Sequence, residues 1–338
     1  MTEDYDIEAL IGSTASDKTA ALPDCILAPY TYLESIPSNN KNVRSTFLQA
    51  FNELYYHITN QELISSIDEV ISIFHNASLL IDDIEDSSNF RRGLPTAHTQ
   101  FGTPLTINSG NLMYFVALQK ATQLPQLYKS HIDPQLSEKV SGILVDEMLN
   151  LHHGQGLDIY WRDAKESVTS PPTIEQYLQM IMNKTGGLFR LSVRLLECFD
   201  ESTPAATTTN TPLANLLGII YQIRDDYLNL VDPNYSHMKG YTGEDLIEGK
   251  LSLPILHCLL NSQDSPIKHV LLMKDREVLK SNGELVARCI SYMETETKSL
   301  QFTHSLLKQY QQRAQDIILQ NASEDCLLLQ VVNKLCNV

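Results

Sequence analysis

Apolar residues recur at spacings of three and four along most of the chain, whereas the strict alternation of a half-buried strand is hard to find over more than a few residues. This pattern predicts a nearly all-helical protein. We expect helices at residues 43–58, 61–87, 105–125, 135–162, 173–197, 212–232, 243–262, 283–297, 299–320 and 323–336. Loops are expected at residues 87–102, 166–172 and 201–212.

The chain has 338 residues, enough for one large core or two ordinary domains. It contains no repeat or linker that would divide it, so we expect one domain at residues 27–338 after a flexible leader at residues 1–26. No uncharged apolar run approaches the roughly 20 residues that span a bilayer. Residues 1–21 resemble neither a signal peptide nor a transit peptide. We therefore expect a soluble, cytoplasmic protein with no transmembrane segment.

Charge and cysteine content narrow the function classes. The formal charge of −16 argues against a nucleic-acid partner, because such proteins usually present a basic face. The six cysteines show no close pairs at metal-ligand spacing and have apolar neighbours, so they are expected to be reduced core thiols.

An acidic cluster ends one of the predicted apolar helices. Asp82 and Asp86 lie one turn apart on one helix face, with His75 and Ser78 further back along it. Carboxylates at a helix C-terminus are unfavourable, and like charges one turn apart repel each other. A divalent cation would reverse both penalties, and oxygen ligands without cysteine favour magnesium or manganese. Taken alone, such a cluster is more often a solvated helix end.

A second cluster makes a shared cavity more plausible than two isolated acidic surfaces. Asp225 and Asn229 again lie one turn apart, with Gln222 on the same side of an otherwise apolar helix. Several basic residues accompany the two clusters, and each alone would be read as a surface charge. They are Lys41, Arg44, Arg91, Arg92, Lys184, Lys239 and Lys250. Because arginine and lysine bind phosphates, the sequence predicts a cavity with a metal site and two anion sites.

In this set of motifs the chain resembles the trans-isoprenyl diphosphate synthases, most closely the fungal and animal geranylgeranyl diphosphate synthases. The resemblance covers roughly residues 27–300 and rests on motifs in a fixed order. They are Lys41 with Arg44, residues 75–92, residues 151–161, residues 183–187, residues 221–229 and residues 248–254. The resemblance implies an all-α single domain of antiparallel helices around a deep central cavity, paired as a homodimer.

The resemblance also implies roles for individual residues. Asp82, Asp86 and Asp225 would hold magnesium, three ions in all with substrate bound, and Asp83 and Asp226 would support them. Isopentenyl diphosphate would be held by Lys41, Arg44, His75 and Arg92. The allylic diphosphate would be held by Arg91, Lys184, Lys239 and Lys250. Thr185 and Gln222 would lie near the reacting carbons.

The length of the product can also be predicted. A growing tail would run from the metal site along the helix of Asp82, where Ala77 and Ser78 lie just over one turn back. Neither is large enough to block it. Tyr114, Phe115 and His152 match positions that limit tail length in the fungal enzymes, although ordinary helix packing could explain each of them. We therefore expect a product of twenty carbons, geranylgeranyl diphosphate.

Two alternatives stay open at this stage. A class I terpene cyclase shares the implied fold and one acidic motif, but it would not need Lys41, Arg44, His75 and Arg92. A non-catalytic partner subunit of a prenyl synthase would be expected to lose its aspartates or basic contacts, and both acidic motifs are present here.

Overall fold

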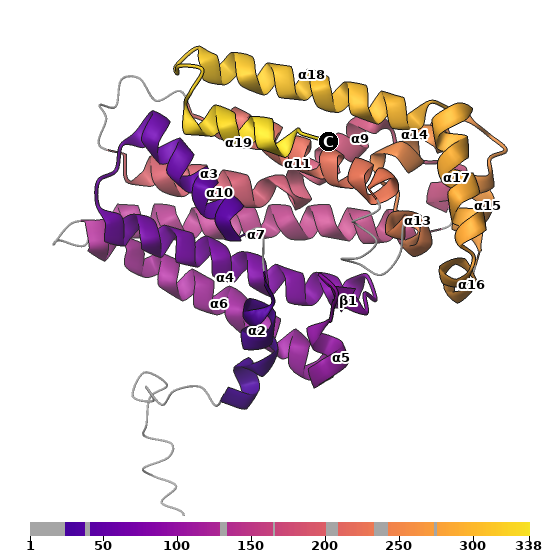
Figure 1. Ribbon diagram of the computed structural model, residues 1–338. Coiled ribbons are helices and arrows are strands. Elements are labelled where there is room, and N and C mark those ends of the chain that lie inside the picture. The colour runs from indigo at the N-terminus through magenta and orange to yellow at the C-terminus, as the bar shows by residue number, and fades with distance from the viewer. Residues whose placement is uncertain are drawn as a thin grey trace, which may run out of the picture.

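The computed structural model describes residues 24–37, 41–128, 134–164, 166–200, 209–232, 243–273 and 276–338. Long helices run side by side through the molecule, with α18 along one edge and α13 to α17 gathered at one end (Figure 1). The helices are α2 (Asp24–Ser35), α3 (Lys41–Phe51), α4 (Gln61–Glu85), α5 (Ala97–Phe101), α6 (Thr103–Tyr128), α7 (Pro134–Asp163), α8 (Glu166–Thr169), α9 (Ile174–Lys184), α10 (Gly186–Cys198), α11 (Thr211–Val231), α13 (Glu244–Glu248), α14 (Leu253–Asn261), α15 (Pro266–Leu272), α16 (Arg276–Ser281), α17 (Gly283–Thr295), α18 (Ser299–Leu319) and α19 (Leu327–Leu335).

Helix α4 lies in the main core and packs against α6, α2, α10 and α3. Its side chains Ile67, Val70 and Leu80 are fully buried, as the three- and four-residue apolar spacing requires. A second, smaller core joins α13 to α17 through residues such as Leu246, Ile255 and Met293. The predicted all-α fold class is therefore confirmed.

Helix α4 is also the one helix in the described part of the chain that is long and apolar enough to cross a membrane. Half of its most apolar window is buried within the protein, and its last turns include Asp82, Asp83 and Glu85. These are properties of a core helix.

Two predicted helices are interrupted. The helix expected at 173–197 is divided at Thr185 into α9 and α10, and the one expected at 243–262 is divided into α13 and α14. The second break follows from Pro254, which lies in the first turn of α14 and has no N–H to donate to a preceding helical turn. In both places the break lies beside the cavity described below.

Some elements were not predicted. Helix α2 begins at Asp24, before the predicted domain start at residue 27, and residues 1–23 lie outside the described part. The loop expected at 87–102 contains α5 and a hairpin of β1 (Phe90–Arg91) and β2 (Leu94–Pro95). Arg92 and Gly93 form its turn, and both have positive φ, as tight hairpins of this kind require. Tyr32 of α2 donates a hydrogen bond to the Pro95 carbonyl, so α2 anchors this hairpin.

Candidate functional site

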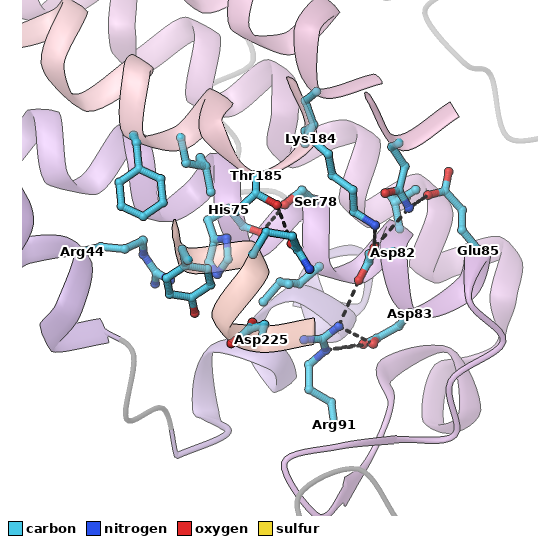
Figure 2. Close-up of a pocket in the computed structure, with 18 of the residues that line it drawn as sticks. Arg44, His75, Ser78, Asp82, Asp83, Glu85, Arg91, Lys184, Thr185 and Asp225 are labelled. Atoms are coloured by element: carbon cyan, nitrogen blue, oxygen red, sulfur yellow. Dashed lines mark hydrogen bonds and ion pairs between the residues drawn. The ribbon is translucent and has the colours of Figure 1, made fainter. Parts of the chain in front are cut away.

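A cavity of about 360 Å³ opens between the C-terminal end of α4, the hairpin, and helices α3, α7, α9, α10 and α11. Figure 2 shows acids and bases from these elements pointing toward one another across it. The cavity brings together most residues that the sequence singled out. They are Arg44, His75, Ser78, Asp82, Asp83, Arg91, Arg92, Tyr114, His152, Lys184, Thr185, Gln222, Asp225, Asp226 and Lys250.

Asp86 is not among the residues that line the cavity and is described below. Four further predicted site residues need separate mention. Lys239 and the side chain of Lys41 lie outside the described part of the structure. Ala77 is fully buried within the core and is not among the cavity-lining residues, whereas the adjacent Ser78 is one of them. Phe115 is 69% exposed on the outside of α6, so the structure does not bring it to the cavity. The expectation that Phe115 forms a floor inside a single chain was therefore wrong: its side chain points outward while the preceding Tyr114 points inward.

The first acidic cluster is divided between two faces of α4. Asp82 faces the cavity, where Gln155 Nε2 lies 3.1 Å from its Oδ1 and Lys184 Nζ lies 3.8 Å away. Asp83 is buried and accepts two hydrogen bonds from Arg91 Nε, at 2.8 and 2.9 Å. Arg91 Nη2 also reaches Asp82 Oδ2, at 3.4 Å (Figure 2). Arg91 therefore ties the two neighbouring carboxylates together.

Asp86, the last acid of this cluster, is paired with an arginine from α7. Arg162 Nη1 lies 2.6 Å from Asp86 Oδ1, and its Nη2 donates to the Glu85 carbonyl at the end of α4. Burial and the neighbouring charge of Asp82 raise the pKa of Asp86 to about 6. The environment thus resists a second bare negative charge beside Asp82.

The two lysines of the cavity are each held by a buried carboxylate. Lys184 Nζ lies 2.6 Å from Asp158 Oδ2, and Lys250 Nζ lies 3.8 Å from Asp245 Oδ1. Burial alone would lower the pKa of Lys184, but Asp158 and Asp82 raise it above the ordinary value. Burial would raise the pKa of Asp158, but Lys184 and Lys250 lower it. Lys184 and Asp158 therefore both stay charged at neutral pH.

The two aspartates of the second acidic cluster also have different surroundings. Asp225 is part-exposed toward the cavity, whereas Asp226 is buried among three donors: the Tyr177 hydroxyl, Gln222 Nε2 and the Leu253 amide. Gln222 in turn accepts a 2.6 Å hydrogen bond from Thr185. Asp226 thus fixes the geometry of α11 next to Asp225 and, through Gln222, that of Thr185.

The opposite side of the cavity is basic. Arg44, His75, Arg91 and Arg92 surround a small side pocket next to the main one. Burial, with Arg44 and Arg91 nearby, holds the pKa of His75 well below its usual value, so its imidazole is neutral. A neutral donor among three guanidinium groups suits an anion with several oxygens.

Away from the charged groups the cavity becomes apolar. Phe47, Ile71, Leu188 and Leu151 line this part, together with Tyr114 and His152, whose rings lie 5.7 Å apart. The residues from Ile71 to Asp82 on α4 span about 16 Å at 1.5 Å per residue. A chain-like apolar group attached to an anion at the mouth would fit this shape.

The donor set at the mouth fits magnesium. Within the described ranges, no three side chains of His, Cys, Asp or Glu are grouped closely enough to hold a metal ion alone. Asp82 on α4 and Asp225 on α11 both line the cavity, and all their ligand atoms are carboxylate oxygens. Magnesium usually takes one or two carboxylates and completes its shell with water and substrate phosphates. Asp82, Asp86 and Asp225 could hold it in that way.

Sequence reasoning missed several residues of this site. Gln155, Asp158 and Arg162 contact Asp82, Lys184 and Asp86 from a single face of α7. Their spacing of three and four residues, within and just after the motif at residues 151–161, was the available signal. Tyr177 had no comparable signal, because its partner Asp226 lies 49 residues further along the chain. Asp245 was also missed, although its partner Lys250 lies close to it in the sequence.

Comparison with known proteins now has a structural frame. A family model described as polyprenyl synthetase matches residues 24–292. The chain belongs to the polyprenyl synthetase family. It is 44% identical over 241 residues to a geranylgeranyl pyrophosphate synthase of Eremothecium gossypii, covering 71% of each chain. It is 38% identical over 302 residues to a geranylgeranyl pyrophosphate synthase of Hericium erinaceus, covering 85% of each.

A third relative has a different name. A copalyl diphosphate synthase of Talaromyces verruculosus is 41% identical over 90% of this chain, which spans only 28% of that longer protein. Family membership confirms the predicted prenyltransferase class and its all-helical fold.

Proposed function

We propose that the protein is a geranylgeranyl diphosphate synthase that adds isopentenyl diphosphate to an allylic diphosphate, with farnesyl diphosphate as the expected primer. The observation that carries the proposal is a single cavity with two separate cationic groups around a set of carboxylates. Arg44 and Arg92, with neutral His75 beside them, form one group, and Lys184 and Lys250 form the other. In the proposal each cationic group binds one diphosphate, and the apolar part of the cavity receives the hydrocarbon tail of the allylic substrate. The names of the fungal relatives support the twenty-carbon product.

In this mechanism Arg44, Arg92 and neutral His75 bind isopentenyl diphosphate. Lys184 and Lys250 bind the allylic diphosphate, with Lys239 and Lys41 as further ligands on the two sides. Asp82, Asp86 and Asp225 would hold magnesium, which would supply neutralising charge for the departing diphosphate. Lys184 and Lys250 add positive charge at the same place, since their carboxylate partners keep them protonated.

The remaining residues position the substrates and shield the allylic cation from water. Thr185 and Gln222, which are hydrogen-bonded to each other, would lie near the reacting carbons. Apolar walls from Phe47, Leu188 and Leu151 keep water from the allylic cation until the isopentenyl double bond attacks it. Arg91 is bound to Asp83 and Asp82. It therefore contributes to diphosphate binding by orienting these two acids and by its own positive charge.

The product length, the ions and the assembly belong to the same proposal. Ser78, Tyr114 and His152 all line the cavity. In the proposal the small Ser78 lets the tail pass, and Tyr114 with His152 would limit its length. Three magnesium ions, with manganese as a substitute, would act with substrate bound. A cytoplasmic location stays a prediction from the sequence alone.

A homodimer is supported by an apolar stripe on the outer faces of α6 and α7. Exposed apolar side chains recur there at helical spacing: Ile107, Phe115, Val145, Leu149, Leu157 and Tyr160. Gly142 and Gly156 on α7 add open space for a close approach. Contiguous exposed apolar surface of this kind is typical of a protein interface.

The proposal is tested by incubating purified protein with magnesium, radiolabelled isopentenyl diphosphate and farnesyl diphosphate, and by sizing the dephosphorylated products. A twenty-carbon alcohol that disappears without magnesium and in an Asp82→Ala variant is the expected result. The copalyl diphosphate synthase relative makes a cyclised product from one diphosphate the second candidate. Cyclised hydrocarbon without isopentenyl incorporation would favour that candidate, and no incorporation with any allylic primer would refute elongation.

A further inference from the structure

The interruption between α9 and α10 places two residues in the cavity. Lys184, the last residue of α9, reaches Asp158 and Asp82, and Thr185 bonds to Gln222. The apolar pattern alone predicts an uninterrupted helix at 173–197. Something in the fold must therefore hold the break open.

Arg190 occupies the polar gap that the break creates. In a continuous helix the Met182 carbonyl would accept from the amide of Gly186, four residues on. Here Arg190 Nη1 donates to that carbonyl at 2.6 Å and to Asn215 Oδ1 on α11 at 3.0 Å. A Cβ at 186 would lie 3.0 Å from Arg190 Nη1, so glycine leaves more room for the guanidinium than any other residue would. The guanidinium folds back over the start of its own helix.

The guanidinium is itself fixed from α7. Arg190 Nε donates to Glu147 Oε2 at 2.9 Å, and Nη2 forms an ion pair with the same oxygen at 2.8 Å. Glu147 is 1% exposed and Arg190 is 6% exposed. Arg190 therefore links α7, the end of α9 and α11 through one rigid, planar group.

The two helices that flank the break pack tightly against it. A Cβ at Gly154 of α7 would lie 2.4 Å from the Lys184 nitrogen, and one at Gly218 of α11 would lie 2.5 Å from the Gly186 Cα. The backbone at 184–186 thus has no room to shift toward either helix. Its remaining freedom is to rewind into a regular turn, and that is the movement the Arg190 contact to Met182 opposes.

We propose that Arg190 is a positioning residue for the allylic half of the reaction: by occupying the Met182 carbonyl, it keeps the α9–α10 break in the form that presents Lys184 and Thr185 to the allylic diphosphate. The inference rests on the proposed function. The buried Arg190 guanidinium caps the end of α9 by donating to the Met182 carbonyl. Arg190 itself does not touch the substrate.

The test compares Arg190→Met and Arg190→Lys with Arg194→Met. Arg194 lies one turn further along α10, and it binds Glu147 and the exposed Asp146. Arg190→Met should raise the KM for farnesyl diphosphate and lower kcat, together by about 100-fold in kcat/KM, the scale expected for a small misplacement of a binding group. The KM for isopentenyl diphosphate should stay within about twofold. Arg190→Lys should recover part of the loss, and Arg194→Met should resemble the wild type.

A double variant separates positioning from stability. Arg190→Met with Glu147→Met removes the buried charges together, a change that usually restores stability. The thermal midpoint should recover while the KM for farnesyl diphosphate stays raised. If both recover, or if Arg194→Met shows the same kinetic defect, Arg190 only neutralises Glu147 and the inference is wrong.

Hydrogen exchange at the amides of residues 185–187 provides a readout without catalysis. Arg190→Met should alter their exchange rates, and Arg194→Met should leave them unchanged; equal rates in both variants would overturn the inference. If the wild type makes no prenyl product, the proposed function fails, and this exchange result still decides whether Arg190 holds the break.

Discussion

Tyr177 and Asp226 form a buried pair whose energetic role can be predicted in detail. The Tyr177 hydroxyl donates to Asp226 Oδ2, and the ring is 1% exposed. Replacing Tyr177 with Phe removes one donor to a charged group and leaves Gln222 and the Leu253 amide as partners. Such a bond contributes about 1.5–3 kcal/mol. At about 2.1 cal/mol/K per residue, unfolding of the chain has an entropy of about 0.7 kcal/mol/K, so the thermal midpoint should fall by about 2–4 °C.

The loss should depend on pH. Burial, opposed by Lys250, raises the pKa of Asp226 to about 6, and the bond from Tyr177 lowers it. Because the folded-state pKa is above the unfolded value, Asp226 favours the folded state fully at low pH, and this contribution is lost as pH rises through about 6. Tyr177 limits that loss by stabilising the ionised form. Its removal should therefore cost more at pH 8 than at pH 5, where a bond to a neutral carboxyl contributes only about 0.5–1.5 kcal/mol.

The assay is thermal unfolding followed by circular dichroism, with EDTA present, at the two pH values. Tyr32→Phe is the matched control, because its hydroxyl donates to the uncharged Pro95 carbonyl. That variant should lose stability equally at both pH values. An equal loss at both pH values for Tyr177→Phe would refute the reasoning, since it would mean that the hydroxyl does not distinguish the ionised from the neutral carboxyl.

Three further predictions concern the cavity, the surface and the charges. Ser78→Phe should shorten the main product below twenty carbons, because Ser78 lines the tail cavity; Ser78→Ala should leave it unchanged, and an unshortened product from the Phe variant would contradict the cavity assignment. Phe115→Asp should convert the dimer to monomers in light scattering after size exclusion, whereas Phe90→Asp, on the exposed hairpin, should not; an intact dimer in the first variant would exclude this face. Lys184→Met should destabilise the protein in urea by about 3–5 kcal/mol, because it removes the closest cation from buried Asp158. Adding Asp158→Leu should recover most of that loss, and no recovery would show that the pair is not the cause.

Periodicity predicted the long helices because apolar residues recur at spacings of three and four along each of them. Helices α4, α6, α7, α11 and α18 were all predicted with bounds close to those observed. The break at Thr185 had a local signal in Gly186 and Gly187, which follow it directly. The contacts of Arg190 with Glu147 and Asn215 could not be predicted, because these residues meet only in three dimensions. Helix α2 was not predicted, and it contains Pro29, a residue that usually interrupts helices.

The site residues were also predictable only where their signal is local in the sequence. Asp82, Asp225 and their basic neighbours were recognisable because the motifs lie within single helical turns. Their partners were not, because the pairing of Asp86 with Arg162 spans 76 residues and that of Tyr177 with Asp226 spans 49. Phe115 shows the opposite error: its neighbour Tyr114 faces the cavity, and a helix turns about 100° per residue, so adjacent residues face different surroundings.

The acids at the cavity mouth are already matched with cations of the protein itself. Arg91 Nη2 lies 3.4 Å and Lys184 Nζ 3.8 Å from Asp82, and Arg162 Nη1 lies 2.6 Å from Asp86. A lone divalent ion would have to compete with these groups for the same oxygens, whereas one arriving with a diphosphate brings anionic oxygens that the displaced guanidinium and ammonium groups can bind. These ion pairs therefore favour an order of addition in which metal and diphosphate bind together. The enzyme without substrate should bind free magnesium weakly.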